Sequence, residues 1–194
     1  WRKTSSTSAR TFKRFKYNYV YDAAGRLSGI GNANPASASE PGQYISSIAY
    51  NARGQTTAIT YGGGVTTSFG YNDARGFLAS VLTRKDGQTV LDLGYARNAK
   101  GMVTGISSSD SSRAWVYGYD ELDRLVSADN RGGTAEDRSF AYDDADNLIA
   151  NSGLCGGAGL VYPAAGSARP HAPVSICGAP VTYDANGNTL SYDP

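Results

Sequence analysis

The sequence is short of several residue types on which common protein classes depend. It has two cysteines in 194 residues, too few for a disulfide-rich scaffold or a four-cysteine zinc site, and its one histidine is His171. Leu, Ile, Val and Phe together number 33, below the share typical of an ordinary globular core. No run of about 18 apolar residues occurs, so the sequence predicts no membrane span. No signal peptide is visible after Trp1.

Tyrosine and glycine take the place of the missing aliphatic residues. The chain has 14 Tyr and 24 Gly, and its net charge of +1 is too low for disorder driven by charge repulsion. Aromatic residues interspersed with many turn formers are typical of short β-strands. No sustained 3.6-residue apolar period appears. We therefore expect an all-β protein with little or no helix.

A tyrosine with an apolar residue two positions before it recurs seven times. A spacing of two places both side chains on the same face of a strand. The five central anchors are 21, 24, 24 and 23 residues apart, which suits one antiparallel hairpin per unit and indicates a repeat array. The anchor tyrosines are Tyr21, Tyr50, Tyr71, Tyr95, Tyr119, Tyr142 and Tyr183.

Each anchor is followed by a tight turn. An Asp or Asn near its start can hydrogen-bond the backbone two residues on, and a glycine four places after the tyrosine suits the left-handed conformation that closes a hairpin loop. The copies at Tyr71 and Tyr95 have one and two extra residues before their glycines, so we expect wider loops there. The aspartates are Asp22, Asp120, Asp143 and Asp184; the glycines are Gly25, Gly54, Gly76, Gly101 and Gly187, with Asp123 and Asp146 at that position in two copies.

The composition divides the chain into four stretches. Residues 1–16 form a basic lead-in strand or linker, 17–150 the repeat array, 151–180 an irregular Gly- and Pro-rich insertion, and 181–194 a last repeat. The lead-in has six basic residues and no acid, which is read either as a site for an anionic partner or as a solvated strand whose acidic neighbours lie elsewhere in a larger protein. We favour the second interpretation and expect no nucleic-acid partner.

Candidate chemistry is sparse, and we expect no catalytic residue, metal or cofactor. Cys155 and Cys177 could form one disulfide in an oxidising compartment, or a thiol nucleophile with His171. The Asp- and Asn-rich turns resemble calcium loops, but the turn requirement alone explains these residues. Arg26 and Arg124, just after two of the turns, are expected to pair with acidic turn residues of neighbouring hairpins.

The segment Tyr21 to Leu27, Tyr-Asp-x-x-Gly-Arg-Leu, resembles the YD repeat of the RHS-repeat family. The resemblance runs from about Tyr17 to Asp193. Near the end, Pro170-His171-Ala172 precedes Tyr-Asp-Ala-Asn-Gly-Asn at 183–188, as in the region shortly before the conserved core of these proteins. Seven anchors at near-constant spacing, together with this ending, make the resemblance specific.

The resemblance implies a β-hairpin ribbon that spirals into part of a hollow shell enclosing a C-terminal toxin domain. Such shells occur in bacterial toxin complexes and secreted contact-dependent effectors, and related repeats build teneurin-like adhesion proteins. It implies a non-enzymatic structural segment, secreted or at the cell surface. The implied partners are other YD repeats of a larger protein, the enclosed cargo, and secretion-system or toxin-complex components. The self-cleaving protease core and the toxin domain of the family are not found in this sequence.

Two other functions stay open on the sequence. The chain could be an extracellular adhesion module that binds glycans through exposed tyrosines and Trp115. It could also be a hydrolase built around the insertion and its two cysteines. The direction in which the anchor tyrosines point discriminates the first from a shell wall, because buried anchors could not bind sugars.

Overall fold

The computed structural model describes residues 16–32, 42–154 and 159–192. The chain divides into two compact units, one comprising residues 1–71 and 80–91 and the other residues 72–79 and 92–194. Nearly all of the basic lead-in, most of the loop after residue 32, and Cys155 lie outside the described residues. The predictions made for them stay predictions.

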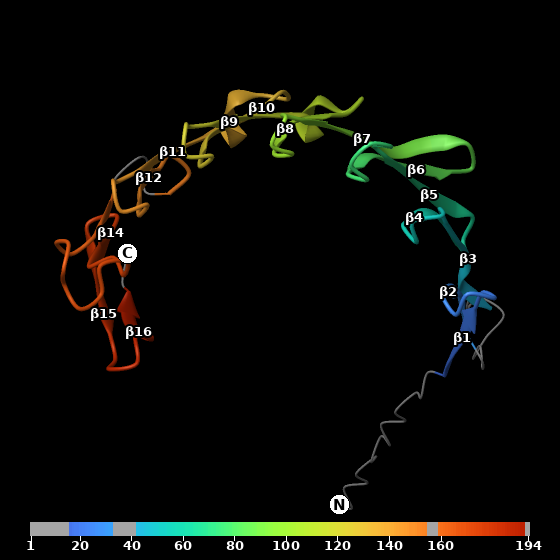
Figure 1. Cartoon of the computed structure of the whole chain (residues 1–194), viewed down its shortest axis with the longest axis horizontal. Coiled ribbons are helices and arrows are strands. Elements are labelled where there is room, and N and C mark those ends of the chain that lie inside the picture. Colours follow the sequence, from blue (N-terminus) through green and yellow to red (C-terminus); the bar gives the residue numbers. More distant parts are fainter. Residues whose placement is uncertain (1–15, 33–41, 155–158, 193–194) are drawn as a thin grey trace, which may run out of the picture. The chain divides into compact units, whose positions relative to one another are not determined.

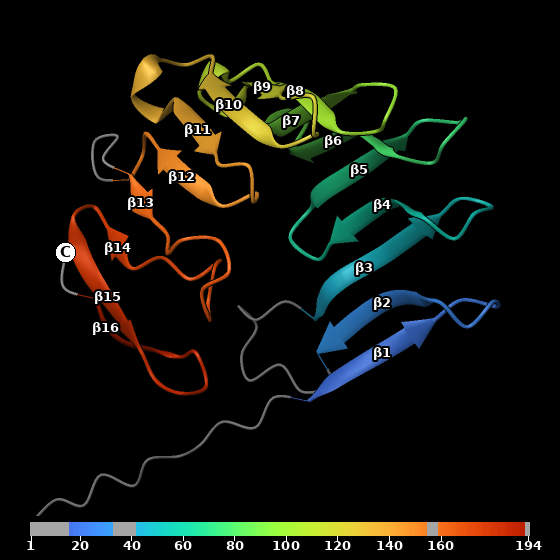
Figure 2. The same ribbon diagram turned by 60° about the vertical axis from the view of Figure 1, so that its left-hand side comes forward.

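The described residues form 16 strands and two single-turn 3-10 helices, so the expected all-β class is confirmed. Twelve strands make one antiparallel sheet in chain order, and the last four make a second sheet (Figures 1 and 2). The strands are β1 Tyr17–Tyr21, β2 Leu27–Asn32, β3 Gln43–Tyr50, β4 Thr56–Tyr61, β5 Val65–Tyr71, β6 Leu78–Lys85, β7 Gln88–Arg97, β8 Val103–Ser107, β9 Trp115–Tyr119, β10 Leu125–Asn130, β11 Arg138–Tyr142, β12 Leu148–Asn151, β13 Leu160–Val161, β14 Ser175–Ile176, β15 Ala179–Tyr183 and β16 Thr189–Tyr192. The 3-10 helices are η1 Ser111–Arg113 and η2 Thr134–Glu136.

The first unit shows the repeat in its simplest form. Strands β1 and β2 form one hairpin and β3 and β4 the next, and their turns lie at the same edge of the unit (Figure 2). In both hairpins the ladder shifts by one residue beside the turn, at Tyr21 and at Tyr50. The shift is a β-bulge, and it places each anchor tyrosine at the start of its turn.

The second unit repeats this pattern from β7 to β12. The hairpins β7–β8, β9–β10 and β11–β12 each carry the same shift beside the turn. The lateral register aligns Tyr95, Ile106 and Trp115 across three strands, so these large side chains share one face. The neighbouring row is Ala96, Gly105 and Val116, and the opposite face is therefore lined by smaller residues.

Neither unit has an ordinary buried core. Among the described residues, the buried apolar side chains are Ala114, Ala128 and Val181, and no large side chain is fully buried. Most strand residues are half-buried, as expected for a sheet one layer deep. The shortage of aliphatic residues thus reflects a sheet whose stability rests on contacts between neighbouring hairpins.

Two local predictions were wrong. The loop after Tyr95 is not wide, because β7 continues through Arg97 and the turn is the ordinary four-residue one, from Asn98 to Gly101. The stretch 151–180 is not wholly irregular, because Leu160 pairs with Ile176 and thereby joins β13 and β14 to the second sheet. The wider loop after Tyr71 does occur, since the amide of Gly76 bonds Asn72 O four residues back rather than three.

Candidate functional site

The repeated turns have the hydrogen bonding predicted for them. In the first turn, Asp22 Oδ1 accepts bonds of 2.9 Å from the amides of Ala24 and Arg26, and the amide of Gly25 closes the loop onto Asp22 O at 3.0 Å. Gly25 has φ +75°, a left-handed conformation that glycine adopts without steric cost. The same bonds recur from Asn51, Asp120, Asp143 and Asp184.

Aspartate replaces glycine at two of the left-handed positions. Asp123 has φ 65° and Asp146 has φ 64°, as the alignment of the repeats predicted. Both carboxylates receive a cation from the neighbouring hairpin: Lys100 Nζ lies 2.6 Å from Asp123 Oδ1, and Arg124 Nη1 lies 2.7 Å from Asp146 Oδ1. Aspartate tolerates this conformation better than most residues, and it supplies a charge that glycine cannot.

The anchor tyrosines connect each hairpin to the one before it. Tyr50 donates its hydroxyl to Leu27 O at 2.7 Å, and Leu27 lies two residues after the turn glycine of the preceding hairpin. The same bond recurs three times, from Tyr71 to Thr56 O at 2.8 Å, from Tyr119 to Val103 O at 2.7 Å, and from Tyr142 to Leu125 O at 3.0 Å. We call each such contact a joint. The repeated tyrosine is therefore the residue that ties one repeat to the next.

The residue after the left-handed turn position, Gly25 or Asp123, completes two of the joints. Arg26 lies over the ring of Tyr50, with Cζ 4.5 Å from the centroid, and Arg124 lies over Tyr142 at 4.8 Å. A guanidinium over an aromatic face is attracted by the ring quadrupole. Each arginine is held by an aspartate of its own turn, Arg26 Nε by Asp22 at 2.8 Å and Arg124 Nε by Asp120 at 2.7 Å.

The predicted pairing of these arginines with neighbouring turns is right for one and wrong for the other. Arg124 also reaches Asp146 of the next hairpin, whereas the pair that Arg26 forms among the described residues is with Asp22 of its own turn. The reason is local: the bulged turn brings its first residue and the residue after its glycine to face each other. Asn51 and Gln55 make the same contact as a neutral pair, through an amide bond of 2.9 Å.

One joint is built with its partners exchanged. Counting back four residues from Gly101 gives Arg97, not Tyr95, and Arg97 Nη2 donates at 3.2 Å to Leu78 O, the carbonyl that a tyrosine would otherwise take. Phe77 stands where Arg26 and Arg124 stand, and Arg97 Cζ lies 5.4 Å from its ring centroid. The anchor of this repeat is therefore Arg97, and the assignment of Tyr95 to that role was wrong.

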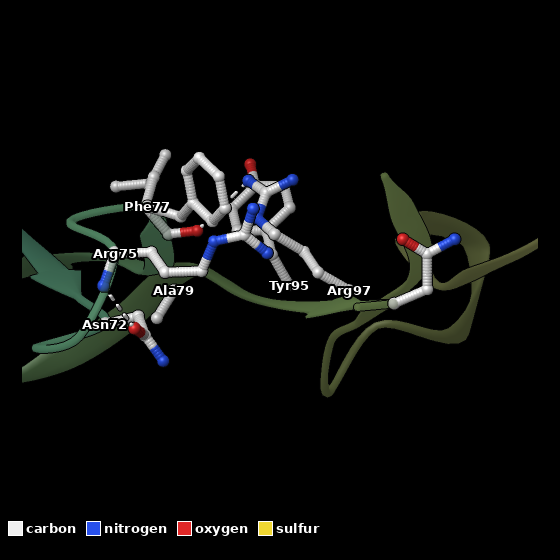
Figure 3. Close-up of a pocket in the computed structure, with 8 residues that line it drawn as sticks. Asn72, Arg75, Phe77, Ala79, Tyr95 and Arg97 are labelled. Carbon is white, nitrogen blue, oxygen red and sulfur yellow. Dashed lines mark hydrogen bonds between the residues drawn. The ribbon is translucent and has the colours of Figure 1, made fainter. Parts of the chain in front are cut away.

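The exchanged joint contains a pocket of about 200 Å³ (Figure 3). Phe77, Leu78 and Ala79 form its apolar wall, and Arg75 and Arg97 bring two guanidinium groups to it. Arg75 Cζ lies 4.8 Å from the Phe77 centroid, so both cations flank the same ring. Arg75 Nη1 also donates to Ala99 O at 2.7 Å, across to the next turn.

The insertion continues the line of contacts between turns. His171 Nδ1 bonds Asn147 Oδ1 at 2.8 Å, and Arg169 Nη2 donates to Asp184 O at 2.6 Å. The Tyr183 hydroxyl donates a hydrogen bond to Pro173 O at 2.9 Å, so the last joint is made with the insertion instead of a preceding hairpin. No local pattern in the sequence predicts these pairings, since the partners lie 10 to 24 residues apart.

Cys177 is not a free thiol, because it is disulfide-bonded. Its sulfur lies 3.7 Å from the Tyr192 hydroxyl. The described structure therefore offers no free thiol to pair with His171, which the hydrolase hypothesis required of Cys177. Cys155 lies outside the described residues, and its role stays a prediction.

Hydrogen bonds to the turn aspartates keep these groups ionised. The side-chain amide of Asn147, with the backbone amides of Asn147 and Ala145, holds the pKa of Asp143 below its usual value. In the last turn the side-chain and backbone amides of Asn188 do the same to the pKa of Asp184. In the part of the chain that the structure describes, no three His, Cys, Asp or Glu residues gather as metal ligands would. The carboxylate oxygens of the turn aspartates thus accept hydrogen bonds from backbone amides.

Comparison with known proteins agrees with this architecture. The family model "RHS Repeat" matches residues 50–89. No curated protein matches the chain. Among the helices of the described residues, none has the length and apolarity needed to cross a membrane.

Solved structures of toxin complexes share the fold. A crystal structure of TcdB2-TccC3 without its hypervariable C-terminal region superposes with a TM-score of 0.68 at 18% identity, over 91% of this chain and 11% of the other. The TcdB2-TccC3-Cdc42 crystal structure gives 0.66 at 19%, over 89% and 11%. The Photorhabdus luminescens Tc holotoxin pore with a TccC3 mutation gives 0.63 at 19%, over the same shares.

This chain spans only about a ninth of the length of those proteins. Its likeness to them is a likeness of fold, carried by hairpins that follow one another in a single antiparallel sheet. The matched repeat at 50–89 includes Tyr50 and Tyr71, which make two of the joints. The recurring joint, the RHS repeat matched at residues 50–89 and the shared fold are all consistent with the resemblance of this chain to RHS-repeat, or YD-repeat, proteins.

Proposed function

We propose that this chain is a stretch of the wall of an RHS-repeat shell, and that its function is mechanical enclosure of a polypeptide cargo. The cargo would be a toxin domain carried by the same larger protein or complex. The chain itself would be non-enzymatic, secreted or at the cell surface, with the other repeats and toxin-complex components as partners.

The observation that carries this proposal is the joint. Successive hairpins are tied by the same tyrosine-to-carbonyl bond, so a sheet one layer deep can be lengthened repeat by repeat without a core. A protein built this way gains surface with every repeat while burying little, which suits a wall better than a catalytic domain. The fold shared with toxin-complex proteins supports the same role.

The proposal is tested on the full-length protein by protease protection of its cargo. We expect the cargo to resist protease in the intact protein and to become susceptible when Tyr50, Tyr119 and Tyr142 are all changed to Phe. The matched control is Tyr117→Phe, because the Tyr117 hydroxyl makes no hydrogen bond in the described structure. Enclosure would be ruled out if the cargo were digested as fast in the unaltered protein as in the triple variant. An image of the unaltered protein that shows a solid particle with no internal space would rule it out as well.

A glycan-binding module is the second candidate, supported by one observation. Trp115 and Tyr117 are half-buried and stack with their planes 4° apart and centroids 6.2 Å apart, and aromatic faces of this kind can pack against sugars. The anchor tyrosines are divided: Tyr71, Tyr119 and Tyr142 are half-buried with their hydroxyls used in joints, whereas Tyr21 is 60% exposed. Glycan-array binding that disappears in Trp115→Ala would establish this function, and an array without signal would remove it.

A further inference from the structure

The exchanged joint has an unbalanced charge. At the two joints that carry an arginine after the left-handed turn position, an aspartate of the same turn lies within 2.8 Å of that arginine. In the exchanged joint the first turn residue is Asn72, which is neutral, and its side chain accepts from the backbone amide of Arg75 at 3.0 Å. Among the residues that the structure describes, neither Arg75 nor Arg97 forms an ion pair. In the described residues, no carboxylate is therefore paired with either of the two cations that flank Phe77.

Some donors in this pocket are unused. The Nε atom of Arg97 is buried without a hydrogen-bond partner, and a buried polar group without a partner costs free energy. Nε and Nη2 of Arg75 make no bond in the described structure. Neither does the hydroxyl of Tyr95, which lines the same pocket, because the Leu78 carbonyl is taken by Arg97.

The size and lining of the pocket limit which ligands can fit it. A pocket of about 200 Å³ is smaller than the 300–1,000 Å³ typical of cofactor and drug sites, and fits a group the size of one side chain. Its wall of Phe77, Leu78 and Ala79 suits a short apolar stem, and its guanidinium groups suit a carboxylate at the end of that stem. Figure 3 shows Arg75, Phe77, Tyr95 and Arg97 gathered in this pocket.

We propose that the pocket between Arg75, Phe77 and Arg97 is a binding site for a carboxylate, the side chain of a glutamate or aspartate on a polypeptide held by the wall. The carboxylate bonds Arg75 and Tyr95 and neutralises the field of Arg97, while its stem packs on Phe77. Only the source of the acidic residue rests on the proposed enclosure of a polypeptide. The pocket itself is argued from its own contacts.

The test is an amide NMR titration of the 194-residue protein with N-acetylglutamate, N-acetylglutamine and inorganic phosphate. N-acetylglutamate should give saturable shifts confined to residues 72–79 and 95–98, and the neutral glutamine analogue should give none. Arg75→Gln should weaken binding about fivefold or more, since bonds to charged groups are the stronger ones. Arg131→Gln, the same change at an exposed arginine in another turn, should leave the affinity unchanged.

A second variant guards against a folding defect in Arg75→Gln. Tyr95→Phe keeps both arginines and should weaken binding about two- to fivefold, as expected for one neutral hydrogen bond. The proposal would be overturned if the two amino-acid analogues gave equal shifts or if no shift saturated. It would also be overturned if Arg131→Gln lost as much affinity for N-acetylglutamate as Arg75→Gln, or if phosphate bound more tightly than N-acetylglutamate. The titration contains no cargo, so a negative result would not contradict the proposed enclosure. Likewise, a failure to protect the cargo from protease would not contradict the carboxylate site.

Discussion

Arg97 and Phe77 form the same cation–ring contact as Arg26 and Tyr50, with cation and ring exchanged between the hairpins. In the regular joint the arginine follows the turn glycine and the ring is the anchor of the next hairpin, 4.5 Å away. In the exchanged joint the ring follows the turn glycine and the arginine is the anchor, 5.4 Å away. Both anchors also donate to the carbonyl two residues after the preceding turn glycine. The two contacts have similar geometry, but the positions of the cation and the ring are exchanged.

A reversed pair predicts strong coupling between its two positions. Phe77→Arg alone adds a third guanidinium beside Arg75 and Arg97, and Arg97→Tyr alone removes the cation, so each should destabilise the second unit. The double variant restores the regular order and should recover about 0.5–2 kcal/mol relative to the sum of the single changes. A double-mutant cycle from urea unfolding measures this energy. Strictly additive effects would show that the two residues do not interact.

Removing the hydroxyl of one joint tyrosine should lower the free energy of unfolding by the contribution of a typical hydrogen bond. Tyr119→Phe removes the bond to Val103 O and should lower the free energy of unfolding by about 0.5–1.5 kcal/mol. Tyr117→Phe, on the same strand but with an unbonded hydroxyl, should change it little. Amide hydrogen exchange at β8 provides a local readout, and the opposite ranking of the two variants would refute the role assigned to the joint.

The left-handed turn positions can be tested without changing any contact. Gly54 has φ +77° and open space where a Cβ would stand, so Gly54→Ala adds backbone strain alone and should cost about 1–2 kcal/mol. Gly63→Ala is the matched control, because Gly63 has equal space and is not among the positive-φ residues. Thermal unfolding of both variants gives the comparison. A Gly54→Ala protein as stable as the control would contradict the turn conformation.

Acid should weaken the turns in a defined direction. The pKa of Asp143 is lowered in the folded protein by the bonds from Asn147 and Ala145, so its ionised form stabilises the fold. That stabilisation is complete above the unfolded pKa, near 3.8, and is lost as the pH falls through the lower folded pKa. Asp143→Asn should flatten the fall in unfolding free energy between about pH 5 and pH 2. Asp144→Asn, an exposed neighbour with no side-chain bond in the described structure, should leave the slope unchanged.

The hairpin period and turn chemistry could be read from the sequence because they are local. The Asp or Asn that starts a turn and the residue that closes it lie within four positions of each other, so spacing alone predicted the bonds at Asp22 and the positive φ of Asp123. Arg97 could have been found by counting back four residues from Gly101. The tyrosine pattern points to Tyr95 instead, because the spacing of aromatic residues does not show that β7 extends to Arg97.

The amino-acid sequence by itself determined a chain of antiparallel hairpins with tyrosine anchors and tight bulged turns, because alternation along a strand and backbone conformation in a turn depend on near neighbours. Only the tertiary structure decided what the anchors do. Tyr50 bonds Leu27 O across 23 residues and Tyr119 bonds Val103 O across 16, and no spacing rule predicts which carbonyl a hydroxyl meets once hairpins pair side by side. The pocket at Phe77 likewise exists because Arg75 in one turn and Arg97 at the end of β7, distant in the sequence, both lie against one ring.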